Sequence, residues 1–167
     1  MSQTTLDIKE PGLNVLPPGV ERHVVNAGGL TGLQIFPDDE IEIINEEGNQ
    51  ICEIICFDKD GKSELGILNQ KENCKKSFIK ELLKGKDESS LITNLQLKKR
   101  NLDINKSKSS ILFDEQTPSG EKIKIKSKDK CYVIFAAPQN NMLVSEQNPS
   151  SDLTLFIKRY KIVNDKE

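Results

Sequence analysis

Few side chains in this sequence are of the types that carry out catalysis or bind metals. The chain has one histidine, His23, and four cysteines. A histidine can act as a base, a proton shuttle or a metal ligand. No second group of that kind stands beside His23 in the sequence, so we interpret it as structural or solvated and retain it as a candidate site residue.

The cysteines do not form a catalytic or metal-binding motif. Cys52 and Cys56 are four residues apart, and in an extended strand their thiols share one face at a separation of more than about 10 Å. Zinc sites place thiols closer together on a turn, so a metal would have to recruit His23, Cys74 or Cys131 from elsewhere. A catalytic cysteine also needs an adjacent base. The sequence therefore predicts no metal site and assigns no catalytic residue.

Gln50 and Glu53 are polar residues in an apolar setting. Residues 50–57 are apolar on both faces except at Glu53, which is typical of a strand covered on both sides. Buried polar groups need hydrogen bonds, either to the protein or to a ligand. Two interpretations stay open. Gln50 and Glu53, with Arg22, line a pocket for a small amine or amide, or they belong to a structural network.

Five alternating lysines follow one another late in the chain. Such a ladder could hold an anion, but an edge strand protected from aggregation by its lysines is the favoured interpretation. The chain as a whole has 24 basic and 26 acidic residues and a net charge of -2. It lacks the basic excess of a nucleic-acid-binding protein. The ladder consists of Lys122, Lys124, Lys126, Lys128 and Lys130.

Short runs rich in Ile, Val and Phe alternate with turn residues along most of the chain, as is typical of strands. Eight such runs predict a mostly β domain, either a sandwich or barrel-like. The third and fourth runs, joined by a Gly/Asn turn, predict a β-hairpin. The runs are residues 20–25, 30–36, 40–45, 50–57, 109–113, 121–126, 131–137 and 153–163.

One segment has helical spacing instead. Residues 69–72 read as a capping box, and the apolar positions that follow predict an α-helix near residues 70–84 that ends at Gly85. Residues 86–108 fit neither period and predict a loosely structured crossover. We divide the chain into an extended lead-in (1–19), a single β-rich domain (20–163) and a polar tail (164–167).

The sequence also predicts where the protein resides. Its first residues have neither a basic region nor an apolar region of a signal peptide, and no stretch approaches the roughly 18 apolar residues of a membrane span. The four cysteines do not form the dense pattern of a secreted disulfide scaffold. We expect a cytoplasmic protein that contacts neither membrane nor nucleic acid.

Several segments together resemble a known family. Residues 24–29 and 45–50, with Glu53 and Phe57, are similar to the opening of the urea-carboxylase-associated domain family, whose function is uncharacterised. Further segments resemble the version of that domain fused ahead of folate-dependent aminomethyltransferases related to the glycine-cleavage T-protein. These segments are residues 17–19, 60–61, 118–121, 136–138, 146–149, 152–153 and 158–159. Gln147 and Asn148 lie in one of them and complete the ligand-binding candidates.

The resemblance implies an accessory role in amine or one-carbon metabolism. Longer family members carry a downstream cluster of histidine, aspartate and cysteine suited to metal binding, but this sequence has no histidine after His23. The transferase's catalytic and folate-binding domains are absent too. We therefore expect no cofactor of its own, folate only through a fused or separate aminomethyltransferase-like partner, and no catalysis by this chain alone.

Two alternatives remain at this stage. The first is a small enzyme acting on a C–N bond, which needs His23, Glu53 and a cysteine to meet in the folded protein. The second is a purely structural interaction module without a ligand pocket.

Overall fold

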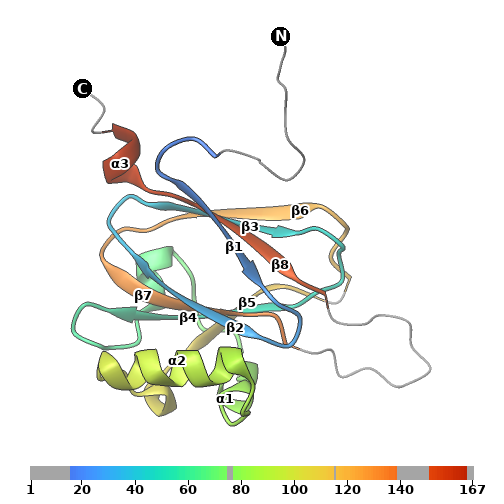
Figure 1. Cartoon of the computed structure of the whole chain (residues 1–167), viewed down its shortest axis with the longest axis vertical. Helices are drawn as coiled ribbons and strands as arrows, with labels where there is room; N and C mark the ends of the chain where they lie inside the picture. The colour runs from blue at the N-terminus through green and yellow to red at the C-terminus, as the bar shows by residue number, and fades with distance from the viewer. Residues whose placement is uncertain (1–15, 75–76, 115, 139–150, 165–167) are drawn as a thin grey trace.

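The computed structural model describes residues 16–74, 77–114, 116–138 and 151–164, which form two β-sheets and a layer of helices (Figure 1). Both sheets are antiparallel. Their strand orders are β1-β8-β3-β6 and β2-β7-β4-β5. The predicted mostly β fold of eight strands is confirmed, in its sandwich form. The strands are β1 (Val20–Val25), β2 (Leu30–Ile35), β3 (Glu40–Asn45), β4 (Cys52–Asp58), β5 (Ser109–Phe113), β6 (Glu121–Lys126), β7 (Cys131–Ala136) and β8 (Leu153–Lys158).

The predicted hairpin of β3 and β4 is wrong, because these two strands belong to different sheets. β3 pairs with β6 and β8, whereas β4 pairs with β5 and β7. The turn between them contains Gly48 and Asn49, both with positive φ, and the Asn49 amide donates to the Thr117 carbonyl at 2.7 Å. The turn therefore packs against a distant loop and carries the chain from one sheet to the other.

Two apolar cores separate the three layers. The first lies between the sheets and the second between the β2-β7-β4-β5 sheet and the helices. β4 contributes Ile54 and Cys56 to the first core and Ile55 and Phe57 to the second. Residues 52–57 are all buried, which confirms that this strand is covered on both sides.

The first helix is shorter than predicted. Two elements follow β4, the 3-10 helix η1 (Leu65–Leu68) and the helix α1 (Phe78–Leu82). The helical spacing is correct, but the helix begins at Phe78, and its N-cap is Ser77, whose hydroxyl accepts from the Lys80 amide at 3.2 Å. Cys74, predicted to be helical, forms a β-bridge with Ser109 instead. A cap that sequence reasoning placed at residues 69–72 therefore lies several residues further along.

Residues 86–108 are not the loosely structured crossover that we predicted. They contain α2 (Glu88–Lys99) and the 3-10 helix η2 (Ile104–Lys106). α2 lies across the outer face of the β2-β7-β4-β5 sheet (Figure 1). The sequence did not predict this helix because two of its three buried positions, Ser90 and Thr93, are polar and only Leu97 is apolar. The spacing of the leucines therefore does not identify the face of α2 that packs on the sheet.

β8 ends at Lys158, before the predicted strand end at residue 163, and α3 (Tyr160–Asn164) follows. Arg159, between them, binds three groups at once. It donates to Glu21 at 2.9 Å, to Asp39 at 2.8 Å and to the Gln34 carbonyl at 2.8 Å. Tyr160 donates its amide to Asp39, and these contacts turn the chain out of the sheet. No helix in the described part of the chain is long and apolar enough to cross a membrane.

Candidate functional site

Glu53 is fully buried on the side of β4 that faces the helices. Its Oε1 accepts from the backbone amides of Phe78 at 2.7 Å and Ile79 at 3.0 Å. Its Oε2 accepts from the hydroxyls of Ser77 at 2.6 Å and Ser109 at 2.5 Å. Buried N–H groups at the start of a helix need acceptors, and a negative charge there is favourable. Glu53 therefore anchors the start of α1 to the sheet.

Gln50 is also fully buried and fully hydrogen-bonded. Its Nε2 donates to the carbonyls of Ile51 at 2.9 Å and Pro138 at 2.8 Å, and its Oε1 accepts from the Ser151 amide at 2.8 Å. The amide thus joins the end of β7 to the start of β8. Both polar residues that the sequence singled out are hydrogen-bonded to the protein, as the structural-network interpretation requires.

Arg22 and His23 lie in β1, on opposite faces of the strand. Arg22 is exposed on the outer face of its sheet, next to Phe156 of β8. The His23 Nε2 lies 3.0 Å from Glu21. The hydrogen bond from Arg159 lowers the pKa of Glu21, and the one from His23 lowers it further. Because Glu53 lies in the other sheet and faces the helices, the structure does not bring His23 and Glu53 together.

The cysteines are all unbridged in this structure. Cys52, Cys56 and Cys131 are buried between the sheets, and Cys74 is half-buried. Burial, and then the charge of Glu53, raise the pKa of Cys52. A hydrogen bond between Cys56 and Cys131 raises the pKa of the first and lowers that of the second. No group of three potential metal ligands converges among the described residues.

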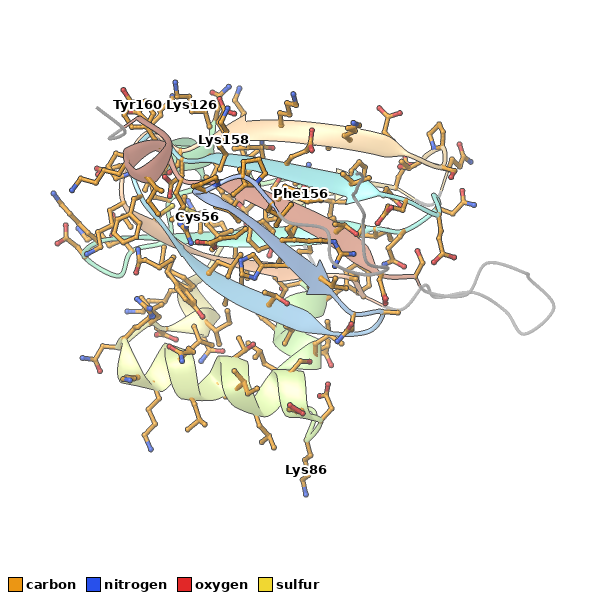
Figure 2. All side chains as sticks on the ribbon, turned by 45° about the horizontal axis from the view of Figure 1, so that its top comes forward. Cys56, Lys86, Lys126, Phe156, Lys158 and Tyr160 are labelled. Atoms are coloured by element: carbon orange, nitrogen blue, oxygen red, sulfur yellow. The ribbon has the colours of Figure 1, made fainter. Side chains whose placement is uncertain are left out.

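Three lysines of the ladder lie on β6, an edge strand of its sheet, whereas Lys128 and Lys130 lie in the connection between β6 and β7. The predicted ladder therefore does not lie on a single strand. Lys122, Lys124 and Lys126 face outward, and two of them form long ion pairs, Lys124 with Glu42 at 3.9 Å and Lys126 with Asp38 at 4.0 Å. Figure 2 shows the outer face of this sheet, with Lys126, Phe156 and Lys158 labelled. The edge position agrees with the protective interpretation. Gln147 and Asn148 lie outside the described residues.

Two features that sequence reasoning missed lie around α2. The first is a row of exposed aliphatic side chains: Leu91 and Ile92 are each 52% exposed and Leu95 is 65% exposed. The second is a cavity of about 440 Å³ at the C-terminal end of α2, lined by Arg100 and Tyr132 among others. Neither was recognisable without the helix, since residues 86–108 carried no regular period.

The fold and these contacts define a β-sandwich domain with a helical layer on one sheet. No family model matches the chain, so its resemblance to the urea-carboxylase-associated family stays a prediction. The chain is 34% identical, over 152 residues and 91% of its length, to a protein of Ruegeria pomeroyi named trimethylamine-oxide aldolase. The chain spans only about a fifth (19%) of the length of that curated relative.

Proposed function

We propose that this chain is an accessory domain associated with a larger enzyme of amine metabolism, and that it does not catalyse a reaction alone. One observation carries the proposal: 91% of the chain is similar to a stretch that makes up 19% of a trimethylamine-oxide aldolase, as we expect if the chain corresponds to one domain of such an enzyme. The buried polar groups support it, because Glu53 and Gln50 serve the fold. The finer expectation is that the partner resembles an aminomethyltransferase and carries any folate.

The exposed face of α2 is the surface best suited to such a partner. The helix packs on the domain through Ser90, Thr93 and Leu97, and its Ser90 hydroxyl donates to the Leu82 carbonyl at 2.7 Å. Its larger aliphatic residues point to solvent. We name Leu91, Ile92 and Leu95 the α2 apolar patch. A contiguous exposed apolar patch is typical of an interaction site, and Figure 2 shows side chains of α2 projecting away from the sheets.

The size of this patch favours a partner that is held nearby. Three aliphatic side chains cover far less than the roughly 800 Å² that each partner contributes to a standard interface. A patch of this size binds well when the partner is covalently linked or otherwise held at high effective concentration. The exposed Lys98 and Lys99 at the end of α2 favour an acidic rim on the partner surface.

The test is purification of the tagged chain from its own source cells, followed by identification of the polypeptide that is continuous or associated with it. We expect an amine-processing enzyme of the aminomethyltransferase type, and we expect the double variant Leu91→Gln/Leu95→Gln to lose that association or the associated activity. Ile162→Gln is the matched control, since Ile162 is 52% exposed on α3. Recovery of the chain alone, or equal behaviour of the two variants, would overturn the docking proposal.

The second candidate function is a small enzyme acting on a C–N bond, which the name of the relative favours. It predicts that the isolated chain consumes trimethylamine oxide. Because His23 and Glu53 do not meet, we expect no turnover. Consumption at a rate proportional to chain concentration, and abolished by His23→Gln, would replace the accessory proposal with this one.

A further inference from the structure

The cavity at the end of α2 lies where four segments meet. These are β2 at Gln34, the end of β4 with the turn that follows it, the end of α2, and the start of β7. Its volume of about 440 Å³ is within the range of small-molecule sites, which run from about 300 to 1,000 Å³. The site is therefore large enough for a ligand with several non-hydrogen atoms.

Charged residues of both signs surround this cavity. Asp58 ends β4, and the turn after it contributes Lys59 and Asp60. Arg100 follows α2, and Lys130 precedes β7. None of the five forms an ion pair with another charged side chain in the described part of the protein. The cavity thus offers acidic and basic groups that do not neutralise one another directly.

Arg100 is held in place before any ligand arrives. Its Nη1 donates to the Gln34 Oε1 at 2.7 Å, and its guanidinium lies 4.5 Å from the centre of the Tyr132 ring. Gln34 is fixed in turn, because its Nε2 donates to the Cys131 carbonyl at 2.8 Å. A guanidinium presents several donors in a planar fork that matches a carboxylate. With one of these donors engaged by Gln34, the others can serve a ligand.

On the acidic side of the cavity, hydrogen bonds hold the Asp58 side chain in place as well. The Asp58 Oδ1 accepts from the backbone amides of Asp60 and Lys62, both at 2.9 Å, which shapes the turn and fixes the carboxylate. Asp60 is exposed, and its side chain makes no hydrogen bond to any residue that the structure describes. A cationic group in the cavity would find both carboxylates on the same turn.

We propose that this cavity binds a small zwitterion, whose carboxylate meets Arg100 and Lys130 and whose ammonium group meets Asp58 and Asp60. A simple anion would be repelled by the two aspartates, and a simple cation by Arg100 and the two lysines. Only a ligand with both charges is attracted at both ends. The ligand class comprises amino acids and their N-methylated forms. This inference goes beyond the proposed docking role and does not depend on it.

The experiment measures the melting temperature of the isolated chain with matched probes at constant ionic strength. Glycine and glycine betaine are the zwitterions, and acetate and methylammonium represent their separate halves. We expect at least one zwitterion to raise the melting temperature in a saturable way, since a ligand that binds only the native state stabilises it. We expect the two halves, alone, to leave it unchanged.

Variants locate the binding. Arg100→Gln and Asp60→Asn are each expected to raise the dissociation constant about tenfold or more. The control Lys86→Gln, which removes an exposed charge next to the opposite end of α2, is expected to leave it unchanged. Each variant is compared with and without ligand, so a change in its own stability does not obscure the result. An equal response to acetate, no response to either zwitterion, or binding that survives both cavity variants would overturn the proposal. Because no partner is present, this outcome is independent of the docking test.

Discussion

Removal of the Glu53 carboxylate is expected to loosen α1 from the sheet. Glu53→Ala leaves the amides of Phe78 and Ile79 without their acceptor. It also removes the oxygen to which the Ser77 and Ser109 hydroxyls donate. The hydroxyls can rotate toward each other, because their oxygens are 3.4 Å apart. The amides have no such freedom. Each buried donor without a partner costs about 1–3 kcal/mol, so we expect a loss of about 3–5 kcal/mol in the free energy of unfolding.

Glu53→Gln separates the charge from the hydrogen bonds. The glutamine keeps one oxygen that can accept from the two amides, but its NH₂ group cannot accept from the serine hydroxyls. We therefore expect an intermediate loss of about 2 kcal/mol. The order of stability should be wild type, then Glu53→Gln, then Glu53→Ala.

Urea unfolding followed by far-ultraviolet circular dichroism gives these free energies, and hydrogen exchange of the Phe78 and Ile79 amides reports on α1 itself. Glu72→Ala is the matched control, because Glu72 is exposed and precedes the helix. We expect its stability to stay within about 0.5 kcal/mol of wild type. Wild-type stability and exchange rates in Glu53→Ala would refute the reasoning and would favour the interpretation in which Glu53 binds a ligand.

Three further predictions concern other buried polar groups. Arg159→Gln leaves the Asp39 carboxylate, 2% exposed, without its cation and should cost about 3 kcal/mol at neutral pH. Because Arg159 lowers the pKa of Glu21, that part of the stabilisation is present above the ordinary glutamate pKa and is lost as the pH falls through the lowered value. The difference in urea midpoint between wild type and variant should therefore narrow as the pH falls below the ordinary glutamate pKa, and a constant difference would contradict this. Tyr132→Phe should equal wild type in its free energy of unfolding or exceed it by up to about 1 kcal/mol, since the Tyr132 hydroxyl is buried and has no hydrogen-bond partner among the described residues. A clear loss of stability in urea unfolding would show that the hydroxyl is bonded. In the native chain the half-buried Cys74 should react with a thiol reagent well before the buried Cys52, Cys56 and Cys131, and all four should react in urea. Fast reaction of a second thiol in the native chain would show that the inter-sheet core opens.

Strand positions could be predicted because they depend on local alternation. In β3 the apolar Ile41 and Ile43 point into the core while Glu40 and Glu42 face outward, and this period of two is visible in the sequence. The two-sided burial of β4 was equally visible, since its residues are apolar at successive positions. These features need no knowledge of the partner strands.

Strand partners could not be predicted in the same way. A Gly/Asn turn between two alternating segments is compatible with a hairpin and with a crossing between sheets. The crossing is decided by Thr117 and Gly120, whose backbone groups bond to Asn49 and Asn45 from far along the chain. The α2 helix escaped prediction for a related reason: the surface it packs against exists only after β2 and β7 have come together, and it accepts Ser90 and Thr93 rather than a row of leucines.

The candidate site shows the same division. The sequence by itself determined that Gln50 and Glu53 must be hydrogen-bonded, because an apolar strand cannot bury an amide and a carboxylate without partners. Only the tertiary structure showed that the start of α1 and Ser109 supply hydrogen bonds to Glu53. It likewise placed Arg100 around the same cavity as Asp58 and Asp60, residues about forty positions apart that no local pattern connects. Local sequence fixes what each side chain requires, and the packing of distant segments fixes which group meets that requirement.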